Sequence, residues 1–524
     1  MFKPLAGILL TLVASLALPA GPSALRAEPE APLVIADPRG DRGLLAPFAH
    51  RRDGMGYIYT GFLFDTLVEK DETGAFVPGL ALHWQASGDG LVYDIDLDPS
   101  ARWQDGHPLT AQDVAFTVDY LRRHRHGFVS VEAIGEAVAL DEARLRLRLT
   151  RPDAGFVGEV LAGMPVLPAH VYRDIEDPQR FASLEAAAGS GPYRLATFDK
   201  AQGRYRLEAV AGHRAGPPRF STVVITRLAP EAAALALIRG EADIVPNLMP
   251  AKAAEVAAAG KLVIETSSGH PVRLLFNHRN PVLAPLAVRR ALAHALDRQA
   301  LADIAYQGHA QVAEAGYFQK GSRWLRDGGL PGYAFDPQQA ERLLTEAGWT
   351  RDAAGNWQTE GAPDTLRLVV GEDMRRLAVT LADQFARFGL KVALSVLEQG
   401  ALQDRLASDE FDLALASTST LGDPNGIGRR IVGDDWRHDR FPGDQNLRDL
   451  LRRQSEALDA DERQRLLWQF EDLYLAQLPS LMLVDPVWMT GHSPRVVPVM
   501  PADGVAIGIP SPLHRSLFYR PGAL

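Results

Sequence analysis

The sequence predicts an α/β protein with mixed sheets. Segments with the two-residue period of strands alternate with helix-like segments over most of the 524 residues, and this alternation is typical of the α/β class. The clearest case is a β-α-β unit, in which 364–371 and 390–398 form strands on either side of a helix at 374–389. Hydrophobic residues make up 46% of the chain and charged residues 23%, which is ordinary for a protein with several cores. This length predicts around three domains, at about 150 residues each.

Short alternating segments predict further strands. Residues 31–37 and 411–417 are apolar runs of strand length. Residues 91–97 place apolar side chains on one face and aspartates on the other, which indicates a half-exposed strand. The same alternation of arginine and leucine at 144–150 predicts a strand whose arginines face water rather than an anion.

Helices are predicted where apolar residues recur every three to four positions. The helix predicted within 336–349 has Asp336 as its cap, Pro337 at its first position and Gly348 at its end, and each residue type is favoured there. We expect one long amphipathic helix over 286–306. A helix followed by a short strand is predicted within 56–71. A second helix is predicted within 227–245, where it ends at Gly240 and leads into a strand. The last predicted helix covers 459–477.

The segment from Trp103 to Tyr120 predicts a tight turn followed by a capped helix. Asp105-Gly106 favours the turn. Thr110 can cap the helix through its hydroxyl group, and the side chain of Asp113 can reach back to the backbone N–H of Thr110. Local chemistry therefore explains the conformation of this segment without assigning it a function.

The N-terminal residues resemble a secretory signal peptide, which we place at 1–27. Lys3 precedes an apolar run over 5–18, and small residues follow, with cleavage expected after Ala24 or Ala27. A membrane anchor is the alternative, but the run is shorter than the roughly 20 residues that span a bilayer. The chain has no cysteine for lipoprotein attachment. The mature protein is therefore predicted to be periplasmic.

Charge and cysteine content exclude several classes of function. The net charge is −10, from 55 basic and 65 acidic residues, which argues against a nucleic-acid partner because such binding needs a concentrated basic surface. The absence of cysteine excludes disulfides, thiolate metal sites and cysteine nucleophiles. No phosphate loop, dinucleotide fingerprint, zinc-protease motif or serine elbow is present. We therefore expect no cofactor and no enzymatic activity, with a secreted hydrolase as the remote alternative.

Several motifs in the same order resemble one family. The chain contains Asp65-Thr66-Leu67, "PGLA" at 78–81, Trp84, and "DGHPLTAQDV" at 105–114. The match continues with "GSGPYRL" at 189–195, "GEADI" at 240–244, and the longer segments 274–298 and 333–349. Together these motifs resemble the family 5 extracytoplasmic solute-binding proteins, the receptors of ABC importers for dipeptides, oligopeptides and nickel complexes.

The resemblance implies a two-lobed periplasmic-binding-protein fold with a hinge and an extra domain inserted in lobe I. The implied boundaries are 28–69, 189–279 and 493–524 for lobe I, 70–188 for the inserted domain, and 280–492 for lobe II. The implied function is capture of short peptides or peptide-like solutes in the interlobe cleft and delivery to the permease subunits of the importer. The protein is expected to be a monomer, and closure around the ligand requires no chemical reaction.

The resemblance also suggests ligand-binding residues. Peptide binders of this family hold the peptide ammonium group with an aspartate just upstream of an Asp-Pro pair. Asp423-Pro424 matches the pair, but the upstream position falls near Thr420, so Asp423 either takes the role or only shapes a turn.

The nickel-binding branch provides the alternative ligand, a metal chelate. Its pattern of an arginine followed three residues later by an aromatic residue matches Arg125 and Phe128, and its cleft histidine lies close to His438. Tyr57 and Trp436 complete the predicted ligand-binding residues. No direct metal site is predicted beyond a possible role for His438, because two imidazoles such as those of His124 and His126 would leave a transition metal undersaturated.

Overall fold

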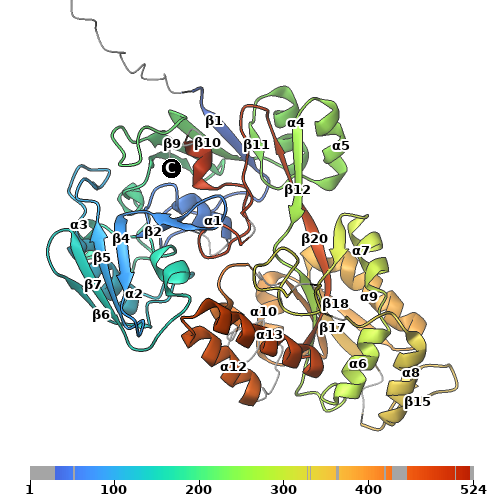
Figure 1. Cartoon of the computed structure of the whole chain (residues 1–524). Helices are drawn as coiled ribbons and strands as arrows, with labels where there is room; N and C mark the ends of the chain where they lie inside the picture. The colour runs from blue at the N-terminus through green and yellow to red at the C-terminus, as the bar shows by residue number, and fades with distance from the viewer. Residues whose placement is uncertain are drawn as a thin grey trace, which may run out of the picture.

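A computed structural model of the chain describes residues 30–50, 54–326, 328–330, 332–361, 365–417, 421–427, 445–501 and 503–519. The predicted signal peptide, Thr420, Trp436 and His438 lie outside these ranges. The described chain forms two α/β bodies joined through one long strand, β20 (Ser480–His492), which crosses from one body to the other (Figure 1). None of the described helices is long and apolar enough to cross a bilayer.

The first body is built on a mixed sheet with the strand order β20-β11-β1-β10-β9-β8, and β12 pairs with β20 beside β11. The central strand β1 runs parallel to β10 and β11, while the other pairs are antiparallel. The strands are β1 (Leu33–Asp37), β8 (Tyr193–Asp199), β9 (Arg204–Ala209), β10 (Thr222–Arg227), β11 (Ile244–Val245) and β12 (Leu262–Ser267). The helices are α1 (Gly54–Thr60), α4 (Pro230–Arg239) and α5 (Pro250–Ala258).

The second body continues the same sheet in the order β18-β17-β19-β13-β20, with β14 also paired to β20. Its strands are β13 (Val272–Phe276), β14 (Ala310–Val312), β17 (Leu366–Gly371), β18 (Val392–Leu397) and β19 (Leu413–Ser417), and a small hairpin joins β15 (Thr350–Arg351) to β16 (Trp357–Gln358). Its helices are α6 (Leu286–His294), α7 (Arg298–Tyr306), α8 (Pro337–Glu346), α9 (Arg375–Phe388), α10 (Gln399–Ala407), α12 (Gln445–Glu456) and α13 (Ala460–Gln477).

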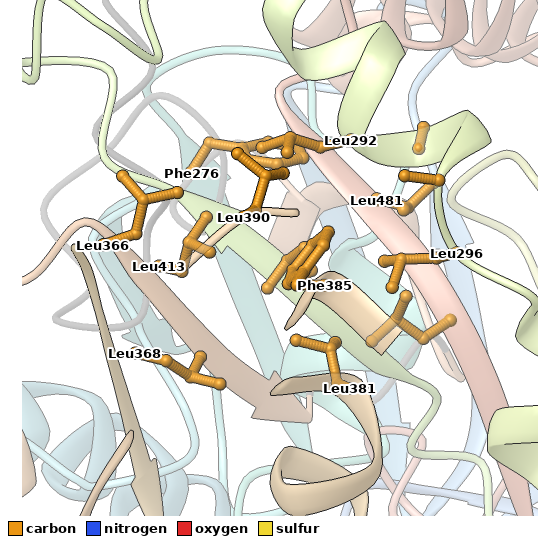
Figure 2. Packing of buried hydrophobic residues seen from close by; sticks show 14 of the residues in the cluster. Phe276, Leu292, Leu296, Leu366, Leu368, Leu381, Phe385, Leu390, Leu413 and Leu481 are labelled. Atoms are coloured by element: carbon orange, nitrogen blue, oxygen red, sulfur yellow. The ribbon is translucent and has the colours of Figure 1, made fainter. Parts of the chain in front are cut away.

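The core of the second body forms where helices cover this sheet. Figure 2 shows Phe385 and Leu381 of α9 facing Leu368 and Leu413 of the sheet. All four side chains are fully buried. Burial of such residues contributes about 1.5–3 kcal/mol each, so this packing fixes the second body as a unit.

A third unit with its own core lies beside the first body (Figure 1). Its antiparallel sheet has the order β4-β5-β7-β6, with α2 packed against β6 and β7. The elements are β2 (Val68–Lys70), β3 (Phe76–Pro78), β4 (Ala81–Ala86), β5 (Val92–Leu97), α2 (Ala111–Arg123), β6 (Ile134–Ala139), β7 (Arg144–Leu149) and α3 (Ala169–Tyr172). Short turns of π or 3-10 type occur at Val157–Leu161, Leu184–Ala187, Glu372–Met374, Pro424–Gly426 and Arg515–Phe518.

Most of the predicted elements are confirmed. Thr110 and Asp113 form a capping box at the start of α2, where the Thr110 N–H donates to the Asp113 carboxylate at 2.9 Å. The β-α-β unit is present, with β17 and β18 parallel. Gly240 ends α4 in the left-handed conformation, with φ of 76°, which glycine adopts without a steric penalty.

The single helix predicted over 286–306 is wrong, because the structure divides it into α6 and α7. Asp297 accepts a hydrogen bond from the Ala300 N–H and caps α7, and a capping residue has a non-helical backbone. The side chain of Gln384 in α9 bonds both the N–H and the carbonyl of Asp297. The break is therefore stabilised by a partner that is distant in sequence.

Two strands do not follow the predicted lobe boundaries. β13 precedes residue 280, yet it pairs with β19 and β20 in the second body. The second half of β20 precedes residue 493, yet it pairs with β12 and β11 in the first body.

Candidate functional site

A pocket of about 360 Å³ opens where the third unit faces the second body. The third unit contributes Phe128, Ser130, Glu132, Ala133, Arg151, Pro152, Asp153, Glu159 and Val160, and the second body contributes Leu421, Asp423, Asn425, Gly426, Leu451 and Ser455. Ile507, from the C-terminal segment, completes the lining. The pocket therefore takes side chains from segments far apart in the sequence, and this volume suits a small polar molecule.

The charged side chains in the described lining of this pocket are mainly acidic. Among the described residues of the lining, four carboxylates, those of Glu132, Asp153, Glu159 and Asp423, accompany one cation, Arg151. Burial raises the pKa of Asp153, and the nearby Asp423 carboxylate raises it further, against the lowering effect of hydrogen bonds from Gly155 and Asn425. A positively charged group placed in the pocket would relieve this repulsion.

Asp423 already has a cationic partner in the protein. Arg463 donates to both of its carboxylate oxygens, with N–O distances of 2.8 and 2.5 Å. The side chains of Arg463 and Asp423 are only 5% and 9% exposed, and the Asn425 N–H donates to the same carboxylate at 2.9 Å. The Asp423 carboxylate therefore caps the turn Pro424–Gly426 and forms an ion pair with Arg463.

The same region joins the third unit to the second body. The Asn425 side-chain amide donates to Asp153 at 2.7 Å. The Ala154 N–H donates to the Ser455 carbonyl at 2.8 Å, and Arg463 donates to the Ala154 carbonyl at 3.3 Å. These bonds lie away from β20, so the second body contacts the rest of the described chain at two separate places.

Phe128 lies on one wall of the pocket and packs against a cluster of aromatic rings. The ring centroids of Phe128 and Tyr57 are 4.8 Å apart, and His50 stacks on Phe128 at 5.7 Å. His126 lies 6.0 Å from Tyr57. The Tyr57 hydroxyl donates to the Gly163 carbonyl, and burial raises the pKa of Tyr57. Tyr57 and Phe128, both predicted as ligand-binding residues, are therefore in contact.

A smaller, mainly apolar cavity of about 70 Å³ lies beside these rings. Tyr57, His126, Lys70 and Glu69 line it together with Arg515. Burial lowers the pKa of Lys70, although the Asp503 carboxylate opposes this effect.

Arg125 lies at the surface, just beyond the end of α2. Its side chain is 91% exposed, and its guanidinium group is 3.6 Å from Glu132, which lines the pocket. The neighbouring His124 packs on Tyr120 with a centroid distance of 4.4 Å, and its pKa is lowered by burial. Of the predicted site residues, the structure brings Phe128 and Asp423 into one pocket and leaves Arg125 outside its lining.

Sequence reasoning missed Asp153, Arg463 and His50. No local pattern marks them, because each acquires its position through a partner far away in the chain: Asp153 through Asn425, Arg463 through Asp423, and His50 through Phe128. The only weak signal is that Asp153 follows Arg151-Pro152 at the end of a predicted strand.

Curated relatives match more than half of this chain at low sequence identity. The Dipeptide-binding protein of Escherichia coli is 25% identical over 398 residues, covering 69% of this chain and 71% of the relative. The Dipeptide-binding protein of Pseudomonas aeruginosa is 25% identical over 490 residues, covering 87% and 88%. Matches to several Brucella proteins are 29% identical and cover 59% of those chains.

Solved structures share the fold. NikZ from Campylobacter jejuni in complex with Ni(L-His) superposes with a TM-score of 0.76 at 21% identity, covering 91% of this chain and 97% of that one. AppA from Bacillus subtilis in complex with a nonapeptide gives a TM-score of 0.73 at 20% identity, covering 90% and 96%. This agreement confirms the predicted two-lobed α/β fold.

The family is identified from the sequence itself. The sequence model described as "Bacterial extracellular solute-binding proteins, family 5 Middle" matches residues 75–432. The match includes most of the third unit, the β-α-β unit and both walls of the pocket at Phe128 and Asp423. Since it covers more than half of the chain, this protein belongs to the family 5 bacterial extracellular solute-binding proteins.

Proposed function

We propose that this protein is the periplasmic solute-binding subunit of an ABC importer. It captures short peptides or peptide-like solutes between its lobes and presents them to the membrane permease, as a monomer and without a chemical reaction. The observation that carries the proposal is the pocket of about 360 Å³, which both the third unit and the second body line. A ligand that contacts both sides favours the arrangement in which they are close together.

The proposed lobes follow the predicted boundaries with two changes. Lobe I comprises 28–69, 189 to the start of β13, and 493–524 together with the second half of β20, which pairs with β11 and β12. The inserted domain comprises 70–188. Lobe II begins with β13 because this strand pairs within the second sheet. The proposed hinge lies in β20 near Pro486, where the partners of β20 change from β14 to β12.

A peptide ligand agrees with the charge of the pocket. The Asp153 carboxylate is half-buried, lines the pocket, and takes the ammonium-binding role in place of Asp423. Phe128 packs against the body of the ligand, and Tyr57 supports Phe128 from behind. Arg125 can reach a ligand carboxylate at the rim after releasing Glu132, because that exposed ion pair is weak.

A metal chelate is the second candidate ligand. The imidazoles of His50 and His126 pack beside Tyr57 and Phe128, and an imidazole is a suitable donor for late transition metals. His438, predicted from the sequence, is the remaining proposed donor. The relative NikZ holds Ni(L-His), whereas AppA holds a nonapeptide, so this fold accommodates both classes of ligand.

The two ligand classes predict opposite responses to substitution. Small molecules that co-purify with the protein would first be identified by native mass spectrometry and then titrated by calorimetry. If the ligand is a peptide, Asp153→Asn should weaken binding by about tenfold or more, because a charge-assisted hydrogen bond contributes about 1.5–3 kcal/mol. If it is a chelate, His438→Ala should weaken binding and Asp153→Asn should not.

Asp94→Asn is the matched control, since Asp94 is an exposed carboxylate on the outer face of β5. Phe128→Ala should weaken binding of either ligand. Unchanged affinity for every one of these variants would show that the ligand does not occupy this pocket.

Ligand binding should also compact the protein. Small-angle scattering of the ligand-free protein is expected to give a larger radius of gyration than scattering at saturation. A ligand that contacts both sides of the pocket favours the arrangement in which they are close together, and the hydrogen bonds from Ala154 and Asn425 across the pocket belong to such an arrangement. The ligand should stabilise the fold by about 2.7 kcal/mol at a hundredfold excess over Kd. An unchanged radius at saturation would contradict hinge closure.

A further inference from the structure

A cluster of three metal-ligating side chains lies on the inserted domain, outside the pocket. Asp105, His107 and His170 each offer one donor atom, and these atoms lie within 4.8 Å of one another. The His170 Nε2 atom is 2.6 Å from one oxygen of Asp105, and the His107 Nδ1 atom is 3.1 Å from the other. It is the only such group of histidine, aspartate and glutamate side chains within the part of the chain that the structure describes.

Two of the three donors sit on a rigid turn. The Trp103 N–H bonds the His107 carbonyl at 2.9 Å, and the Gly106 N–H bonds the Trp103 carbonyl at 2.9 Å. Gly106 has φ of 94°, a left-handed conformation that favours glycine. The His107 N–H donates to Asp105 at 3.1 Å. Asp105 and His107 are therefore held on the same side of the turn by the backbone.

The third donor is fixed by the start of α2. His170 belongs to α3, and the preceding Ala169 N–H donates to the Asp113 carboxylate at 3.1 Å. The Leu167 N–H donates to the Thr117 hydroxyl at 2.9 Å. The same helix that follows the turn thus positions α3 beside it, and the rings of His107 and His170 lie 4.6 Å apart.

The donor set has a clear chemical preference. Two imidazoles and one carboxylate suit zinc and its late transition-metal neighbours rather than magnesium or calcium, which prefer oxygen donors. Zn²⁺ binds nitrogen at about 2.0–2.1 Å and carboxylate oxygen at about 2.0–2.2 Å, so donors on one ion are separated by at most about 4.4 Å. Small side-chain rotations therefore bring all three within reach, and the negative charge of Asp105 offsets part of the charge of the ion.

We propose that Asp105, His107 and His170 form a binding site for a divalent zinc-like ion on the surface of the inserted domain, separate from the interlobe pocket. Three protein donors leave at least one coordination position open. The side chains of His107, Asp105 and His170 are 64%, 37% and 35% exposed, so the ion can exchange with solvent. The site does not depend on which solute the interlobe pocket takes.

The test is calorimetric titration of tag-free, metal-stripped protein with zinc chloride. Wild-type protein should bind one zinc ion at this site, and His107→Ala should weaken that binding by about tenfold or more. The His107 side chain contacts Asp105 and His170 at the surface, so this variant should keep the melting temperature of the metal-free protein. His170→Ala should also lose the site.

His83→Ala, an exposed histidine on β4 of the same domain, is the matched control and should bind zinc as wild type does. Equal zinc affinity in wild type and His107→Ala would overturn the proposal, as would the absence of zinc binding by wild-type protein. Binding that survives in both His107→Ala and His170→Ala would place the ion elsewhere, for example among the histidines beside the pocket, and would also contradict the proposal.

Discussion

Replacing Arg515 with methionine is expected to lower the free energy of unfolding by about 3–5 kcal/mol. Arg515, near the C-terminus, donates to Asp65 at 2.6 Å and to Glu69 at 2.7 Å. The Asp65 side chain is fully buried. Burial alone would raise the pKa of Asp65, but Arg515, with His213 and Arg214, holds it well below its usual range. Without Arg515, a buried carboxylate loses its main partner.

The pH dependence gives this prediction a second readout. Because the folded-state pKa of Asp65 is depressed, its contribution to stability is present above the unfolded-state value of about 3.9 and is lost as the pH falls below it. Arg515→Met should therefore reduce the loss of stability on acidification, as measured by urea denaturation at several pH values. Adding Asp65→Asn to Arg515→Met should recover part of the stability, because an amide is less costly to bury than an unpaired carboxylate.

Arg194→Met is the matched control. Arg194 forms an exposed ion pair with Glu208 on the surface of the first body, and such a pair contributes at most about 1 kcal/mol. If Arg515→Met and Arg194→Met destabilise the protein equally, the C-terminal segment is not anchored by its contact with Asp65.

Glu471→Gln is expected to stabilise the protein at alkaline pH. Glu471 lies in α13 and is fully buried, and burial raises its pKa to about 7, although a hydrogen bond from the Phe318 N–H opposes this change. A folded-state pKa above the unfolded-state value means that stability is complete below about pH 4.5 and declines as the pH rises through about 7. The shift corresponds to about 3 kcal/mol.

Denaturation curves should therefore separate the two proteins by pH. Glu471→Gln and wild type should be about equally stable near pH 4, and the variant should be more stable by up to about 3 kcal/mol at pH 9. Glu346→Gln, at an exposed position at the end of α8, should show no such dependence. If the variant is less stable than wild type at pH 9, the ionised Glu471 carboxylate stabilises the fold, and the prediction is wrong.

The sequence predicts those elements whose causes are local. The capping box at Thr110 and the cap at Asp336 follow from residues about one helical turn apart, and the parallel pair of β17 and β18 follows from the helix that joins these strands in sequence. The break between α6 and α7 is not predictable in this way, because Gln384 stabilises it from another helix. The motifs that resemble the family predict the two lobes but not the strand pairing that sets their boundary.

The residues of the candidate site also divide into those that a motif indicates and those that depend on partners far away in the sequence. Phe128 is suggested by the resemblance to the nickel-binding branch, and it does line the pocket. Asp423 was found through its Asp-Pro pair, but its partner Arg463 lies 40 positions later in the chain, and no local pattern links them. The acidic character of the pocket arises only when Glu132, Asp153 and Asp423 meet across two units.

The position of β20 determines when the sheet can be completed during folding. Its first residue is Ser480, and four strands, β11, β12, β13 and β14, hydrogen-bond to it. Until that segment has been synthesised, these strands have exposed edges, which are prone to pair with other chains. Pairing over such long sequence separations is slow. We therefore expect the chain to reach its native state only after its C-terminal tenth is available, and an earlier truncation to leave both sheets open to aggregation.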